Sequence, residues 1–109
     1  MAYSRFKRLV VKLSGEALVD DHGFGISRKT IRYVADEIRS IFDLGIQIAV
    51  VVGGGNFIRG SAAGSYGMDR ASADHMGMLA TVINSLALQD ALEKIDISTQ
   101  NISQNNMSL

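Results

Sequence analysis

The feature that most constrains this chain is the stretch IQIAVVVGGGNFIRG, residues 46–60. Its first seven residues are nearly all apolar and mostly β-branched, which is typical of a strand covered on both faces of a sheet. Three glycines follow, although glycine weakens both strands and helices because it loses the most conformational freedom on folding. The stretch therefore predicts a buried strand, Ile46 to Val52, that ends in a turn where something approaches the backbone closely.

The residues before this stretch show a strand pattern and then a helix pattern. A short apolar run, residues 9–13, ends at a Ser-Gly pair and predicts a first strand. Apolar residues then recur with the helical period from Ile31 to Phe42, where Ser27 can cap the start and Gly45 can end the helix. Strand, helix and strand in this order predict a βαβ unit with a parallel pair of strands.

A second helix is predicted from about Ser72 to Leu92, and residues 95–99 have the composition of a third strand. The apolar face predicted for this helix consists of Met76, Leu79, Ala80, Ile83, Leu86 and Ala87. These elements predict the α/β fold class with a parallel sheet. The sequence ends soon after the third strand opens, which is unusual for a complete α/β domain.

Composition excludes several classes of function. The 109 residues suit one small domain, and 11 Lys and Arg balance 11 Asp and Glu, which disfavours non-specific nucleic-acid binding. There is no cysteine, and the two histidines have no ligand spacing around them, so we expect no metal site built by this chain. No apolar run approaches the roughly 20 residues that span a bilayer, and the N-terminus does not have a secretory pattern. We therefore expect a cytoplasmic protein without a membrane partner.

Glycine turns follow both predicted strands, at Ser14-Gly15 and at Gly53-Gly54-Gly55. In open parallel sheets, ligands bind beyond the carboxyl ends of the strands, and backbone N–H groups without side chains around them form a surface for anions. Lys12 precedes the first turn and Arg59 follows the second. This combination predicts a phosphate site, although the sequence contains neither of the common glycine-rich phosphate motifs.

Each of these residues also has a purely structural interpretation. The glycines can form a tight turn with close packing, and Lys12 can extend along the sheet surface to solvent. Asp74 can serve as the cap of the second helix, where a carboxylate is favoured by the backbone N–H groups.

Four segments resemble bacterial UMP kinases (uridylate kinases), which have the amino-acid kinase fold: KLSGEAL (12–18), GFGI (23–26), VVGGGNFIRG (51–60) and DHMGMLATVINSLALQDAL (74–92). The DHMGMLAT segment distinguishes them from family members that phosphorylate a carboxylate or carbamate. The resemblance implies the reaction ATP + UMP → ADP + UDP with Mg²⁺, in pyrimidine nucleotide biosynthesis, by a cytoplasmic homohexamer. It also implies the N-terminal part of a parallel-sheet α/β sandwich.

The resemblance assigns roles to individual residues. Residues matched to ATP-side contacts are Lys12, Leu13, Ser14, Gly15, Gly55 and Arg59, with Lys12 also catalytic. Gly54 and Asp74 match contacts to UMP, and a methyl group at Gly54 is expected to take the place of a phosphate oxygen. A loop matches the place where GTP activates some members, opposed by UTP as inhibitor: Asp20, Asp21, His22, Gly23, Phe24 and Gly25.

Members of this family are considerably longer than 109 residues. The resemblance therefore implies that residues 1–109 form a truncated, UMP- and phosphate-binding half, without the C-terminal nucleotide-binding half, and that the chain alone is inactive. Two alternatives stay open. The protein can be another amino-acid kinase that acts on a carboxylate or carbamate, or a non-catalytic fragment that binds nucleotide or associates with other subunits.

Overall fold

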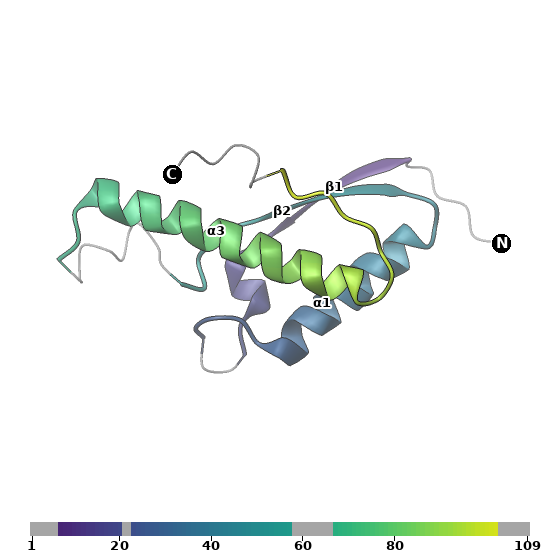
Figure 1. Cartoon of the computed structure of the whole chain (residues 1–109), viewed down its shortest axis with the longest axis horizontal. Helices are drawn as coiled ribbons and strands as arrows, with labels where there is room; N and C mark the ends of the chain where they lie inside the picture. The colour runs from purple at the N-terminus through teal and green to yellow at the C-terminus, as the bar shows by residue number, and fades with distance from the viewer. Residues whose placement is uncertain (1–6, 21–22, 58–66, 103–109) are drawn as a thin grey trace.

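The computed structural model describes residues 7–20, 23–57 and 67–102, which form strands and helices in the predicted order. The elements are β1 (Arg8–Leu13), the 3-10 helix η1 (Gly15–Leu18), α1 (Arg28–Phe42), β2 (Gln47–Val52) and α3 (Arg70–Glu93). Figure 1 shows α3 as the long helix that crosses the molecule, with the two strands beside it. The predicted α/β class and both helices are confirmed.

The two strands form a parallel pair, as the βαβ pattern predicted. The register runs from Arg8 opposite Gln47 to Leu13 opposite Val52, and the N–H of Gly53 continues the ladder by donating to the carbonyl of Leu13 at 3.0 Å. Because the strands are parallel neighbours in register, their carboxyl ends lie side by side at one end of the sheet.

Helix α1 begins and ends as its capping residues predict. The hydroxyl of Ser27 accepts a hydrogen bond from the N–H of Thr30 at 3.2 Å. After Phe42 the chain turns through Gly45, which has a φ of +83° that glycine adopts without strain. The N–H of Gly45 donates to the carbonyl of Phe42 at 2.9 Å.

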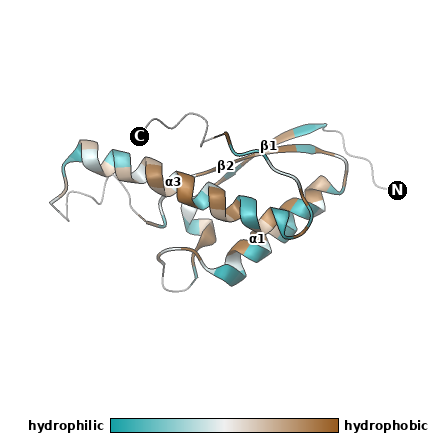
Figure 2. Ribbon diagram, viewed as in Figure 1, coloured by the Kyte–Doolittle hydropathy of each residue, from teal (hydrophilic) through white to brown (hydrophobic). Residues whose placement is uncertain are grey.

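The hydrophobic core lies between one face of the sheet and the helices α1 and α3. Its buried side chains come from η1, both helices, β2 and the segment after α3: Leu18, Ile31, Ala35, Ile38, Val52, Leu88, Leu92 and Ile97. Figure 2 shows apolar residues along both strands and through the middle of α3. Leu13 of β1 packs against this cluster, so the core joins all the described elements into one unit.

The opposite face of the sheet is exposed, so the expectation that β2 is covered on both faces is wrong for the described residues. Val10 on β1 is 68% exposed and Val51 on β2 is 52% exposed. Along both strands exposed residues alternate with more buried ones, because side chains of a strand point to opposite faces in turn. A run of apolar residues does not reveal on its own which face is covered.

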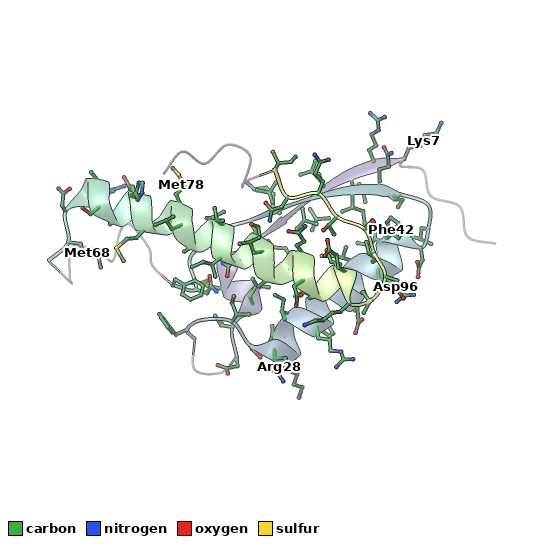
Figure 3. The ribbon with its side chains drawn as sticks, in the orientation of Figure 1. Lys7, Arg28, Phe42, Met68, Met78 and Asp96 are labelled. Carbon is green, nitrogen blue, oxygen red and sulfur yellow. The ribbon has the colours of Figure 1, made fainter. Side chains whose placement is uncertain are left out.

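The apolar face predicted for α3 is also partly wrong. The residues of α3 that are buried are Ala73, Ala80, Asn84, Leu88 and Leu92. Met76, Ile83 and Leu86 are 45%, 49% and 38% exposed, and Met78, labelled in Figure 3, is 58% exposed. The helix has apolar residues around most of its circumference, so the helical period does not identify the face that packs on the core.

Residues 95–99 do not form the predicted third strand. Asp96 has a φ of +63°, which turns the chain at the end of α3, and Ile97 inserts into the core. The polar residues that follow bond to α3 instead of to β2: Thr99 donates to Glu93 at 3.0 Å, and Asn101 donates to Ser85 at 3.1 Å. Side-chain hydrogen bonds thus replace the backbone ladder that a third strand would need.

A cleft of about 580 Å³ lies between β2 and residues 97–102, and α1 and α3 also line it. Figure 1 shows this last segment, in yellow, running beside the sheet. None of the described helices is long and apolar enough to cross a membrane.

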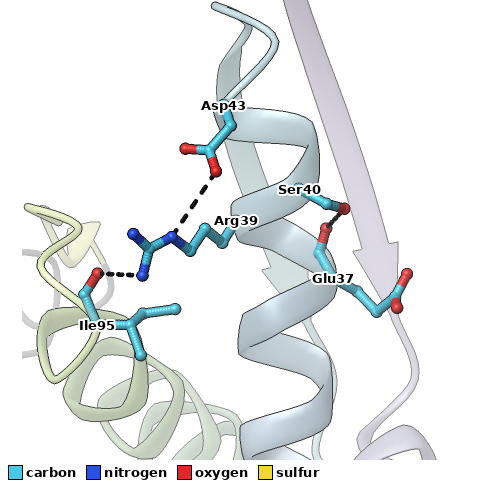
Figure 4. Close-up of polar contacts among 5 residues, drawn as sticks. All are labelled: Glu37, Arg39, Ser40, Asp43 and Ile95. Carbon is cyan, nitrogen blue, oxygen red and sulfur yellow. Dashed lines mark hydrogen bonds and ion pairs between the residues drawn. The ribbon is translucent and has the colours of Figure 1, made fainter.

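Arg39 connects α1 to the turn that follows α3, as Figure 4 shows. Its guanidinium donates to the carbonyl of Ile95 at 3.1 Å and lies 3.7 Å from the carboxylate of Asp43. On the same helix, Ser40 donates to the carbonyl of Glu37 at 2.7 Å. The contact to Ile95 helps to hold the end of α3 against α1.

Candidate functional site

The two glycine turns are in direct contact at the carboxyl ends of β1 and β2. A Cβ atom added to Gly15 would meet three atoms of the second turn: Asn56 Oδ1 at 2.5 Å, Gly55 N at 2.7 Å and Gly53 O at 2.9 Å. No side chain is accommodated at such distances. The turns predicted separately from the sequence therefore form one feature, which we call the glycine corner: Gly15, Gly53, Gly54, Gly55, Asn56 and Asn84.

The first turn is held by short-range hydrogen bonds. The hydroxyl of Ser14 accepts from the N–H of Glu16 at 3.2 Å, and the carbonyl of Ser14 accepts from the N–H of Ala17 at 2.9 Å. Leu18 closes this turn and is fully buried in the core. Gly15 is itself buried, so its position is determined by the protein around it.

Gly54 is a glycine because it lies against the backbone of α3. An added Cβ would meet three atoms of that helix: Gly77 O at 2.7 Å, Ala80 Cβ at 2.9 Å and Thr81 N at 3.1 Å. The expectation that a methyl group here would occupy the place of a phosphate oxygen is wrong, because the methyl group would point into α3. The close packing that the sequence left open as an alternative accounts for this glycine.

The side chains of Lys12 and Leu13 lie on opposite faces of the sheet at the end of β1. Lys12 is the second-last residue of the strand, pairs with Val51, and has an exposed side chain on the outer face of the sheet. Leu13 packs against the hydrophobic core. The side chain of Lys12 is therefore open to solvent near the carboxyl end of β1, whereas Leu13 can offer a ligand only its backbone groups.

Asp74 is the fifth residue of α3, so the interpretation as a helix cap is wrong; Asp69 occupies the cap position. Its carboxylate accepts from Nε of Arg70 at 3.2 Å, and the Asp74 side chain is 60% exposed. Asp74 precedes Gly77 and Thr81 by three and seven residues, which places all three on one side of the helix. Asp74 therefore lies at the end of α3 that contacts Gly54.

The loop expected to sense GTP is joined to the second turn. The N–H of Gly25 donates to the carbonyl of Asn56 at 3.0 Å. The rings of Phe24 and Phe57 pack edge to face, with centroids 5.7 Å apart. Asp20 and Gly23 are also described, whereas Asp21, His22 and the cation predicted after the second turn, Arg59, lie outside the described residues.

Sequence reasoning missed two buried asparagines at the centre of the glycine corner. Asn56 is 2% exposed and Asn84 is 0% exposed. The available signal was Asn84 itself, an amide in the apolar stretch ATVINSLAL at a position in phase with Ala80 and Leu88. A polar residue on the buried side of a helix requires a partner.

The described residues do not build a metal site from side chains alone. Among them, no three His, Asp or Glu side chains lie close enough together to hold a metal ion. The Mg²⁺ expected with ATP is therefore not assigned to any side chain of residues 7–20, 23–57 or 67–102.

The chain is similar to known uridylate kinases. It is 54% identical over 100 residues to the uridylate kinase of Limosilactobacillus reuteri, covering 92% of this chain and 42% of that protein. Among solved structures, the UMP kinase of Bacillus anthracis matches with a TM-score of 0.75 and 47% identity, over 82% of this chain and 36% of the other. The UMP kinase of Ureaplasma parvum matches with a TM-score of 0.77 and 41% identity, over 87% and 42%.

The chain thus spans about two fifths of the length of these relatives. Its parallel strands and helices match the amino-acid kinase fold over that portion. The family model for amino acid kinases matches residues 7–107, nearly the whole sequence. The chain belongs to the amino acid kinase family.

Proposed function

We propose that residues 1–109 form the N-terminal, UMP- and phosphate-binding part of a UMP kinase, which converts ATP and UMP to ADP and UDP. The observation that carries the proposal is the glycine corner, where two backbone turns meet between the exposed side chain of Lys12 and the end of α3 that bears Asp74. The similarity to uridylate kinases supports the choice of UMP as the phosphate acceptor.

The chemistry of phosphoryl transfer agrees with such a site. A phosphate oxygen of UMP attacks the γ-phosphorus of ATP, the bond to the bridging oxygen of ADP breaks, and charge spreads over the transferred group. Catalysis of this kind is mostly positioning and electrostatic stabilisation. In the proposal, Lys12 stabilises the charge, and the backbone of Ser14, Gly15 and Gly55 positions ATP phosphates, together with Arg59.

Asp74 and Gly54 take the UMP side in this proposal. A carboxylate only accepts hydrogen bonds and repels phosphate, so Asp74 suits a ribose hydroxyl or the uracil N–H of UMP. Gly54 has no side chain, so it can contact UMP only through its backbone, and an added Cβ would point into α3. This division would place UMP beside the glycine corner, toward the end of α3 that carries Asp74.

Further parts of the proposal concern the whole protein. Mg²⁺ accompanies the phosphates of ATP and neutralises charge on them, and the protein acts in pyrimidine nucleotide biosynthesis in the cytoplasm as a homohexamer. GTP activates and UTP inhibits, with GTP acting through the loop of residues 20–25. The contact of that loop with Asn56 offers a physical connection to the glycine corner.

The proposal is tested with a fusion enzyme, in which residues 1–109 are followed by the C-terminal part of the Limosilactobacillus reuteri relative. We expect the fusion enzyme to form UDP from UMP and ATP, and the 109-residue chain alone to form none. The intact relative serves as the positive control, and UDP is measured directly by chromatography.

Three results would contradict the proposal. Phosphorylation of a carboxylate or carbamate by the fusion enzyme, without phosphorylation of UMP, would identify another amino-acid kinase. Turnover of UMP by the 109-residue chain alone would show that residues 1–109 contain a complete active site. If neither chain forms UDP while calorimetry detects UMP binding, the chain is a non-catalytic binding module.

A further inference from the structure

The side chains of Asn56 and Asn84 form a reciprocal pair of hydrogen bonds inside the protein. Nδ2 of Asn56 donates to Oδ1 of Asn84 at 3.0 Å, and Nδ2 of Asn84 donates to Oδ1 of Asn56 at 2.6 Å. Both residues are almost completely inaccessible to solvent, with 2% and 0% exposure. Neither side chain can therefore touch a substrate.

Each amide uses its second N–H to hold a backbone carbonyl of a different segment. Asn56 donates to the carbonyl of Gly25 at 2.7 Å, in the loop before α1. Asn84 donates to the carbonyl of Gly53 at 2.8 Å, in the second glycine turn. All four N–H groups of the pair are used, and no buried side-chain nitrogen or oxygen among the described residues lacks a partner.

The pair also contacts the first glycine turn. Oδ1 of Asn56 lies 2.5 Å from where a Cβ of Gly15 would be, so the first turn rests directly on this amide. Asn84 follows Ala80 by one helical turn, and Ala80 is one of the residues of α3 on which Gly54 lies. One pair of side chains thus connects η1, the turn after β2, α3 and the loop before α1.

Stability alone does not explain two buried amides at this place. Burial of polar groups is costly, and apolar pairs of similar shape are often equally stable. A fully satisfied polar network, in contrast, permits only one relative arrangement of the segments that it joins. This is the property that a phosphoryl-transfer site needs, because the donor and acceptor phosphates must be held in line.

We infer that Asn56 and Asn84 are positioning residues that fix the two glycine turns relative to each other for phosphoryl transfer. The inference rests on the proposed function, since it assigns the turns to the phosphates. Asn84 acts through the carbonyl of Gly53, and Asn56 acts through Gly15. Their effect should therefore appear mainly in kcat, and less in the KM of UMP, because neither amide contacts UMP directly.

The kinetic test uses the fusion enzyme with Asn56→Ala, with Asn84→Ala and with both changes. Leu88→Ala is the matched control, because Leu88 is also buried, one turn further along α3, but packs in the apolar core. Misplacement of reacting groups by about 1 Å can reduce a rate by roughly 10²-fold, so we expect a fall in kcat of about that size for each asparagine variant. The KM of UMP should change by less than roughly threefold if its contacts are retained.

The double variant should be about as slow as either single variant, because the two amides act as one unit. Leu88→Ala should lower the midpoint of thermal unfolding and keep the wild-type kcat at temperatures where it is folded. Equal falls in kcat for Leu88→Ala and the asparagine variants, at matched unfolding midpoints, would overturn the inference. So would an unchanged kcat in Asn84→Ala.

Hydrogen exchange of backbone amides tests the inference without any need for activity. In Asn84→Ala, the N–H groups of Gly25 and Gly53 should exchange roughly tenfold faster, while those in the middle of β1 should be unchanged, because the opening is local. In Leu88→Ala the exchange at these sites should change in parallel with the rest of the fold. Unchanged exchange at Gly25 and Gly53 in Asn84→Ala would contradict the inference. Failure of the wild-type fusion enzyme to form UDP would contradict only the proposed function.

Discussion

The strand β2 meets two very different surroundings, the glycine corner at its carboxyl end and the cleft along the edge that does not pair with β1. At the corner, backbone lies against backbone so closely that Cβ atoms on Gly15 and Gly54 would meet protein atoms at 2.5–3.1 Å. Along the edge, a cleft of about 580 Å³ lies between β2 and residues 97–102. We call the latter region the open edge.

The difference shows that local order in this chain comes from two kinds of contact. The corner is determined by excluded volume and by fully satisfied amides, so it permits one arrangement. At the open edge, side-chain hydrogen bonds from Thr99 and Asn101 to α3 hold residues 97–102 in place. The backbone groups of β2 on that edge have no neighbouring strand among the described residues. Exposed strand edges promote association between chains, so self-association of the 109-residue chain should begin at the open edge.

The largest expected effect comes from Lys12, which lies beside the corner without supporting it. Lys12→Ala in the fusion enzyme should lower kcat by roughly 10²–10³-fold, the size expected for one preorganised electrostatic contact. The KM of UMP should change little, and so should the unfolding midpoint, because the side chain of Lys12 is exposed. Steady-state kinetics and thermal unfolding measure the two quantities.

Lys7→Ala is the control for this prediction, since Lys7 is also exposed but lies before the other end of β1. It should leave kcat unchanged. Equal rates for Lys12→Ala and the wild type would remove Lys12 from the mechanism and leave it as a lysine that extends to solvent.

The second prediction concerns the packing of the corner itself. Gly54→Ala should reduce the free energy of unfolding by about 1–3 kcal/mol, the usual cost of overpacking, because the methyl group meets backbone atoms of α3. Gly53→Ala is the matched control, since its Cβ would have only an ordinary contact with Gly15 N at 3.8 Å. Chemical denaturation of both variants measures the difference.

A Gly54→Ala variant as stable as Gly53→Ala would show that α3 moves away from the turn easily. In that case the corner would not be more rigid than the open edge, and the contrast between them would fail.

The smallest effect is expected at the open edge. Asn101→Ala removes partly buried hydrogen bonds to Ser85 at 3.1 Å and to Gln89 at 3.4 Å. It should cost no more than about 1 kcal/mol of unfolding free energy, the net value of a typical hydrogen bond. Denaturation of Asn101→Ala next to Asn84→Ala compares the two regions directly, and an equal loss for both would show that the open edge is as strongly determined as the corner.

The sequence predicted the elements of this fold because their signals are local. The βαβ order, the Ser27 cap and the turn at Gly45 each depend on a few neighbouring residues, and the structure confirms them. The buried faces of β2 and α3 were harder to predict. Both elements are apolar on several sides, and only the tertiary packing decides which side is covered. The prediction of a third strand was wrong for a similar reason. Asn101 bonds to α3, and a sequence pattern does not show that side-chain bonds to a helix compete with pairing to β2.

For the candidate site, the sequence correctly identified the two glycine turns but not the cause of their glycines. A ligand and a helix backbone require the same absence of a side chain, so Gly54 could not distinguish between them until α3 was seen against it. Asn56 and Asn84 were missed because their pairing joins residues 28 positions apart. The roles of Lys12, Asp74 and the loop of residues 20–25 in binding stay predictions.

Helix α3 also joins two regions that lie far apart along the fold. Its 24 residues make a rod of about 36 Å, on which Asp74 lies about 15 Å from Asn84 and Gln89 lies about 7.5 Å from it in the other direction. Buried residues at both ends and in the middle hold this rod against the protein: Ala73, Ala80, Asn84, Leu88 and Leu92. One continuous helix therefore carries both Gln89, which accepts the hydrogen bond from Asn101 near the open edge, and Asp74, which is proposed to contact UMP.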